Sequence, residues 1–138
     1  MTQLLSEHIE MVDEFEAVQR MYLERGWTDG LPVVPPTPDR VETMLVATGL
    51  PPGDVLAELP PTWGAATVEK LAVNAVMAGC LPEYLPVLIA AVEAISDPVF
   101  NLYAIQATTH PCAPLMIING PIRSALGLNS SSGAYGPG

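Results

Sequence analysis

Residues 67–80 read Thr-Val-Glu-Lys-Leu-Ala-Val-Asn-Ala-Val-Met-Ala-Gly-Cys, and they form the most strongly patterned segment of the chain. Thr67 is a favourable N-cap and Gly79 is a common residue just past a helix end, so a helix is predicted from Thr67 to Ala78. Its apolar residues fall on nearly every side, which is typical of a buried helix. The flanking sequence must therefore supply the elements that cover it.

The flanking sequence predicts an α/β fold in which helices pack on a small, partly parallel sheet. Helices are expected at 37–48, 82–96 and 120–126, a short strand at 55–59, a strand at 99–108 and a fully buried strand at 115–119. The helix boundaries follow from Pro at first-turn positions and Gly at helix ends, and the strands from continuous apolar runs.

The first 26 residues predict an amphipathic helix (1–26) that precedes an α/β core (27–138). Apolar residues recur at helical spacing from Leu4 to Tyr22, acidic residues occupy the opposite face, and Gly26 follows the last turn. Such a helix either packs on the core, which the pattern favours, or docks a partner.

Composition and charge exclude several classes of protein. The chain has 138 residues, is 49 % hydrophobic and only 14 % charged, whereas disordered chains are poor in apolar residues and rich in charge. The net charge of −10 and the five dispersed basic residues argue against binding nucleic acid or an anionic membrane surface. No apolar run reaches the roughly 20 residues of a membrane span. With two cysteines and no secretory signal pattern, we expect a cytoplasmic protein.

The charges are distributed unevenly along the chain. All 15 acidic residues lie between Glu7 and Asp97, and Arg123 is the one Lys, Arg, Asp or Glu after Pro98. Because a domain needs polar residues on its surface, this final part is expected to be covered by a second protein chain, either a β subunit or a C-terminal fragment. We therefore expect a fold that is incomplete alone.

The densest group of reactive side chains lies at residues 106–112, between the two predicted strands. Loops after strands commonly hold ligands in α/β folds. His110 is a candidate acid/base, Thr108 and Thr109 are candidate hydrogen-bond donors, and Cys112 is a candidate nucleophile or ligand. The alternative is a buried turn whose hydroxyls satisfy backbone groups.

A second candidate site follows the predicted strand at 115–119. Asn119, Gly120 and Arg123 lie at a predicted helix start, where free N–H groups and a guanidinium can bind a carboxylate or phosphate. An ion pair between Arg123 and an acidic residue is the alternative.

The tail over 129–138 is rich in Ser and Gly, and it contributes Asn129 and Tyr135 as candidate substrate-binding residues. It is either a Gly-rich ligand loop, the end of a self-processed precursor fragment, or an arbitrary end.

No recognised nucleotide, hydrolase or zinc-protease motif is present, so no motif requires a cofactor. A zinc site would require Cys80, Cys112 and His110 to converge, which the sequence signals only weakly. Glu69, Lys70 and Asn74 lie on the apolar helix, where buried polar groups must find partners. They either line a cavity or join helices together, and the second interpretation is favoured.

Three phrases of the sequence resemble one protein family: Gly26–Thr37, Thr67–Cys80 with Pro82-Glu83-Tyr84, and Asn119–Ile122. The family consists of bacterial proteins of poorly defined activity, often found beside or fused to small UGSC-motif (seleno)proteins. The resemblance covers essentially the whole chain, and it implies that the chain is similar to the N-terminal part of longer proteins. It also implies thiol or selenol redox chemistry, although the chain itself has no UGSC motif.

The leading functional hypothesis is an α-type subunit or processed fragment of a hetero-oligomeric enzyme. It would act on a small organic substrate as a hydrolase or lyase, with an active site shared with the second chain. One alternative is a thiol-dependent or metal-dependent oxidoreductase subunit using Cys112, Cys80 and His110. The other is a non-catalytic scaffold subunit.

Overall fold

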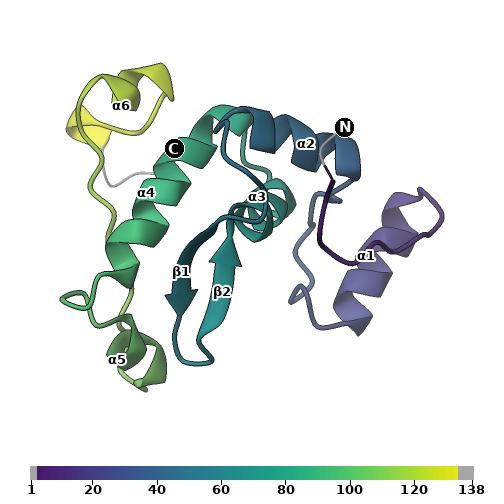
Figure 1. Ribbon diagram of the computed structural model, residues 1–138, viewed down its shortest axis with the longest axis horizontal. Helices are drawn as coiled ribbons and strands as arrows, with labels where there is room; N and C mark the ends of the chain where they lie inside the picture. The colour runs from purple at the N-terminus through teal and green to yellow at the C-terminus, as the bar shows by residue number, and fades with distance from the viewer. Residues whose placement is uncertain (1–2, 134–138) are drawn as a thin grey trace.

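Three helices pack side by side next to a β-hairpin in the computed structural model, which describes residues 3–133 (Figure 1). The helices are α2 (Pro38–Val46), α3 (Val68–Met77) and α4 (Leu85–Ser96). A single 3-10 turn, η1 (Pro82–Tyr84), leads into α4. The prediction of mixed helix and sheet is thus confirmed, and α3 lies between α2 and α4.

Helix α3 supplies the centre of the hydrophobic core, as its apolar sequence predicts. The Thr67 hydroxyl accepts a hydrogen bond from the Lys70 N–H at 3.2 Å, which satisfies one of the free donors of the first turn. Gly79 follows the helix with a φ of +77°, a conformation that glycine adopts without strain. The core comprises Val41, Met44, Leu45, Val68, Ala72, Ala75, Val76, Leu85 and Ile89.

The sheet of the described residues is an antiparallel hairpin, so the prediction of a partly parallel sheet is wrong. Strand β1 (Val55–Leu59) was expected, and it pairs with β2 (Gly64–Thr67) in a register that places Leu59 opposite Gly64 and Val55 opposite Thr67. The sequence Gly-Ala-Ala-Thr of β2 has one β-branched residue, Thr67, and no aromatic residue, and its Gly and Ala residues are depleted in strands, which is why no strand was predicted there.

The strand expected at 99–108 is instead a short helix, α5 (Leu102–Ala107). Asn101 adopts a left-handed conformation (φ 56°), and its side-chain oxygen accepts from the Ala104 N–H at 3.4 Å. Leu, Ala and Gln are good helix formers, so this apolar run favours the 3.6-residue period of a helix over the two-residue period of a strand. The prediction of a strand is therefore wrong.

The strand expected at 115–119 is also wrong, because these residues have no regular structure and their apolar side chains are exposed. Leu115 is 76 % exposed and Ile117 is 80 % exposed. No strand of the described chain pairs with them, so the backbone pairing that would bury such a run is missing here. The helix expected after them is present as α6 (Pro121–Ala125), and η2 (Ser131–Gly133) follows.

The helix expected over residues 1–26 is present only in its second half, as α1 (Phe15–Glu24). Residues 3–14, which we call the N-terminal strap, have no regular structure. Like charges three or four positions apart destabilise a helix, and the strap has such pairs at Glu7/Glu10 and Glu10/Glu14. This repulsion opposes the helix that the apolar spacing favours.

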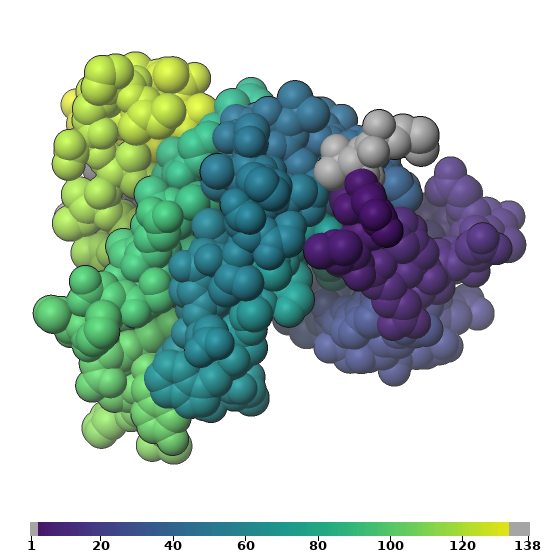
Figure 2. Space-filling view, viewed as in Figure 1, coloured from purple at the N-terminus to yellow at the C-terminus, as the bar shows by residue number. Residues whose placement is uncertain are grey.

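Helix α1 lies apart from the three-helix core, at the opposite side of the molecule from α5 and α6 (Figures 1 and 2). The linker between α1 and α2 joins it to the core. The Gln19 side chain donates to the Val33 carbonyl at 2.8 Å and accepts from the Val33 N–H at 3.0 Å, and the Val34 N–H donates to the Met77 carbonyl at 3.1 Å. None of the helices within residues 3–133 has the length and apolar content to cross a bilayer.

Candidate functional site

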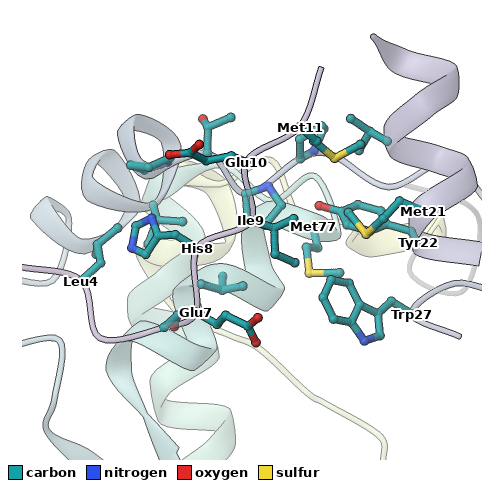
Figure 3. Close-up of a pocket in the computed structure, with 18 of the residues that line it drawn as sticks. Leu4, Glu7, His8, Ile9, Glu10, Met11, Met21, Tyr22, Trp27 and Met77 are labelled. Atoms are coloured by element: carbon teal, nitrogen blue, oxygen red, sulfur yellow. The ribbon is translucent and has the colours of Figure 1, made fainter. Parts of the chain in front are cut away.

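A cavity of about 780 Å³ lies between the N-terminal strap, α1, the linker and α3 (Figure 3). The strap contributes residues from Leu4 to Asp13, α1 contributes Val18, Met21 and Tyr22, and α3 contributes Glu69, Val73, Asn74 and Met77. The volume falls within the range of small-molecule sites in proteins. The cavity is therefore the strongest candidate for a binding site in the described chain.

The linker forms one wall of this cavity, and hydrogen bonds fix its shape. The Trp27 N–H donates to the Tyr22 carbonyl at 2.8 Å, and the two rings have centroids 5.7 Å apart. A compact turn follows, in which the Thr28 hydroxyl donates to the Leu31 carbonyl at 2.8 Å and Asp29 accepts from the Leu31 N–H at 3.3 Å.

The same linker then returns to the cavity through Pro35, Pro36, Thr37 and Pro38. Pro35, Pro36 and Thr37 belong to the phrase Gly26–Thr37, and Pro38 is the first residue of α2. No site is predicted in this phrase from the sequence, and the signal that could have indicated one is Trp27 beside the Thr28-Asp29-Gly30 turn.

Glu69 holds the N-terminal strap over the cavity. Its carboxylate accepts from the Leu5 N–H at 2.8 Å and from the Ser6 N–H at 2.7 Å, and only 1 % of the residue is exposed. Burial by itself would raise the pKa of this carboxyl. The Ser6 side chain, the two backbone N–H groups and the charge of His8 outweigh it, and together they hold the Glu69 pKa below its ordinary value of 4.5. Glu69 thus stays ionised near neutral pH and fixes the strap.

Lys70 and Asn74 also have hydrogen-bond partners, but neither side chain joins two helices, so the favoured interpretation is wrong for them. The Lys70 ammonium donates to the Ala65 carbonyl at 2.8 Å and joins α3 to β2, whereas the Asn74 amide donates to the Lys70 carbonyl within α3 at 2.8 Å. Glu69 joins α3 to the strap, and both Glu69 and Asn74 line the cavity. Lining a cavity, the other of the two interpretations, therefore applies to Glu69 and Asn74, and Glu69 joins α3 to an irregular segment and not to a second helix.

The residues predicted from the sequence as catalytic lie elsewhere, in an exposed turn after α5. The Thr108 hydroxyl accepts from the His110 N–H at 3.1 Å, and the Cys112 N–H donates to the His110 carbonyl at 2.7 Å. Thr109, His110 and Cys112 are exposed, and Thr108 is half-buried. The alternative of a buried turn is therefore wrong, although a hydroxyl does satisfy a backbone group there.

The predicted anion-binding residues flank the start of α6. Gly120 is its N-cap with a φ of +87°, and Asn119 and Arg123 are exposed. Asn129 is exposed and takes part in an interaction of its own. Tyr135 lies outside the described residues. None of the predicted site residues within 3–133 lines the cavity of Figure 3.

The two cysteines have different surroundings. Cys80 follows α3 and packs partly buried against the core, while Cys112 is exposed, and both are free thiols. Within residues 3–133, no group of three or more His, Cys, Asp or Glu side chains is arranged to hold a metal ion.

No protein-family model, no curated protein and no solved structure matches this chain.

Proposed function

We propose that this chain is an α-type subunit, or a processed N-terminal fragment, of a hetero-oligomeric cytoplasmic enzyme that acts on a small organic substrate as a hydrolase or lyase. Its fold is completed by a second polypeptide, which covers residues 99–128, here called the C-terminal segment. The active site forms where the two polypeptides meet.

The exposure of apolar side chains along the C-terminal segment carries this proposal. Val99 is 93 % exposed, and Leu115, Met116 and Ile117 are all more than half exposed. Patches of this kind mark interaction surfaces, because solvated apolar area is unfavourable and obligate interfaces are rich in it. The core cluster extends no further along the chain than Ile89, so these side chains remain available to a partner. The segment lies along one edge of the molecule, where a second polypeptide has access (Figure 2).

The same segment carries the reactive side chains. In the proposed site His110 acts as acid/base, Thr108 and Thr109 donate hydrogen bonds, and Cys112 is nucleophile or ligand. Asn119, Gly120 and Arg123 bind an anionic group of the substrate, and Asn129 and Tyr135 contribute further contacts. Thr109, His110, Cys112, Asn119 and Arg123 are exposed in the single chain, and the partner supplies the wall that excludes water from them.

Co-expression with the polypeptide encoded downstream of Gly138, or by the adjacent gene, tests the proposal. We expect a stable complex, which Ile117→Asp weakens at least tenfold because it places a charge in an apolar interface. The matched control is Val46→Asp, since Val46 is equally exposed but lies on α2, away from the segment. A complex that Ile117→Asp leaves unchanged would contradict the proposal.

Activity of the complex is then measured by mass spectrometry with a panel of small amides, esters and hydroxy acids. We expect turnover that His110→Ala abolishes while the complex stays intact. If the partner alone turns over the same substrate at the full rate, this chain is a non-catalytic scaffold.

A thiol-dependent oxidoreductase subunit is the second candidate, and the exposure of the Cys112 thiol two residues after His110 favours it. In that case Cys112→Ser abolishes activity, and modification of the thiol in the complex inhibits it. Retention of activity by this variant would exclude the candidate.

A further inference from the structure

We propose that the cavity between the N-terminal strap and α3 binds a small hydrophobic organic cation, such as an aryl-alkyl amine. This site is separate from the shared site proposed above and does not depend on the second polypeptide. The proposal rests on the shape, the apolar lining and the charge of the cavity.

The apolar part of the lining suits a hydrocarbon or aromatic body. The labelled side chains of Met21, Tyr22, Trp27 and Met77 gather on one side of the cavity, with Ile9 and Met11 from the strap beside them (Figure 3). Methionine side chains adapt to ligands of irregular shape, and aromatic rings provide large contact areas. A volume of about 780 Å³ accommodates a ligand of drug-like size.

The charged part of the lining suits a cation. Four carboxylates line the cavity, namely Glu7, Glu10, Asp13 and Glu69, and no lysine or arginine does. His8 is the one basic side chain among the lining residues. It lies on the strap, and its charge acts on the Glu69 carboxylate. An ammonium group inside would therefore meet an excess of negative charge, and a carboxylate or phosphate would be repelled.

Trp27 adds a cation-binding surface. The Arg25 guanidinium lies over one face of this ring, with its central carbon 5.1 Å from the centroid, so a ligand cation can use only the opposite face. Tyr22 lies tilted at 45° to the indole. Aromatic rings in this arrangement attract ammonium groups through the negative potential of their faces.

Binding of a ligand in the cavity is coupled to docking of the N-terminal strap on α3. The strap supplies Glu7, Glu10 and Asp13, and its backbone is held by the Glu69 carboxylate at Leu5 and Ser6. A cation in the cavity attracts these strap carboxylates toward the core. Ligand binding and docking of the strap should therefore reinforce each other.

Tryptophan fluorescence tests the proposal directly. The chain has two tryptophans, so in a Trp63→Phe background Trp27 alone reports on the cavity. Three probes of similar shape are titrated: phenethylamine, phenethyl alcohol and phenylacetate. We expect the amine to bind about tenfold more tightly than the alcohol, with an affinity that falls as salt is added, and phenylacetate not to saturate the signal.

Variants that remove charge distinguish the contribution of the carboxylates to affinity from the contribution of the cavity shape. Glu7→Gln with Asp13→Asn should weaken phenethylamine about three- to tenfold and leave phenethyl alcohol unchanged. Both residues are exposed on the strap, so the variant should fold, and Glu83→Gln is the control because Glu83 is an exposed carboxylate outside the cavity. Equal affinity for the amine and the alcohol, an equal loss with Glu83→Gln, or no saturable binding of any probe would overturn the proposal.

Discussion

At the scale of single residues, Glu69 fixes the N-terminal strap, although the helical pattern alone would place it among apolar neighbours. It is buried, it lies on the central helix and it binds two backbone N–H groups that are more than sixty positions away in sequence. A buried carboxylate without such partners would be strongly unfavourable, so the strap and the carboxylate require each other.

We predict that Glu69→Gln destabilises the fold by about 2 kcal/mol, because the amide retains one acceptor oxygen and loses the charge. The loss should depend on pH. The Glu69 pKa is lowered in the folded state, so its contribution is fully present above about pH 4.5 and disappears as the pH falls through the lower folded value. Urea unfolding of both proteins at pH 7 and below pH 4 measures this, and the difference between them should shrink at acidic pH. A constant difference would mean that the carboxylate charge plays no part.

At the scale of helices and strands, local sequence signals correctly predicted the helices whose ends are marked by capping residues. They gave wrong predictions where a contact with a residue far away in the sequence determines the local structure. Thr67, Gly79 and the proline at the start of α2 marked true helix ends. The first half of the predicted N-terminal helix failed because Glu69 offers the Leu5 and Ser6 N–H groups a better partner than a helix crowded with like charges does. The strap and its cavity therefore could not be found from spacing alone.

The connection between α1 and the core depends on one glutamine. Gln19 both donates to and accepts from the Val33 backbone, and the next residue, Val34, bonds to the end of α3. We predict that Gln19→Ala costs about 1–2 kcal/mol and loosens the packing around Trp27, because two partly buried backbone groups lose their partner. Urea unfolding and Trp27 fluorescence in the Trp63→Phe background measure both effects. Arg20→Ala, at an exposed position of the same helix, is the control, and a similar change in both variants would contradict the assigned role of Gln19.

At the scale of the whole molecule, the uneven charge distribution predicted an uneven structure, and the described residues have one. Residues up to Ser96 contain the core cluster, the hairpin and the cavity, whereas Leu102 is buried in the C-terminal segment and Val99, Leu115 and Ile117 are among its exposed apolar side chains. The few charges after Pro98 predict that these residues are covered by a second chain, yet their apolar runs predict buried strands. A continuous apolar run indicates burial but does not say whether the same chain or another provides it.

This division predicts where a protease first cuts the isolated chain. Met116 and Ile117 are exposed and lie in backbone without regular structure, and thermolysin cuts before large aliphatic residues, so brief digestion with thermolysin should first cleave after Leu115 or Met116. The strap is also irregular, but Glu69 holds its backbone, and cleavage there should be slower. Intact-mass measurement of the early products identifies the site. With the second polypeptide bound, the cut after Leu115 or Met116 should slow at least tenfold while slower cuts elsewhere keep their rates. A first cut inside α2–α4, or the same rate with and without the partner, would show that the C-terminal segment is not the exposed and coverable part of this molecule.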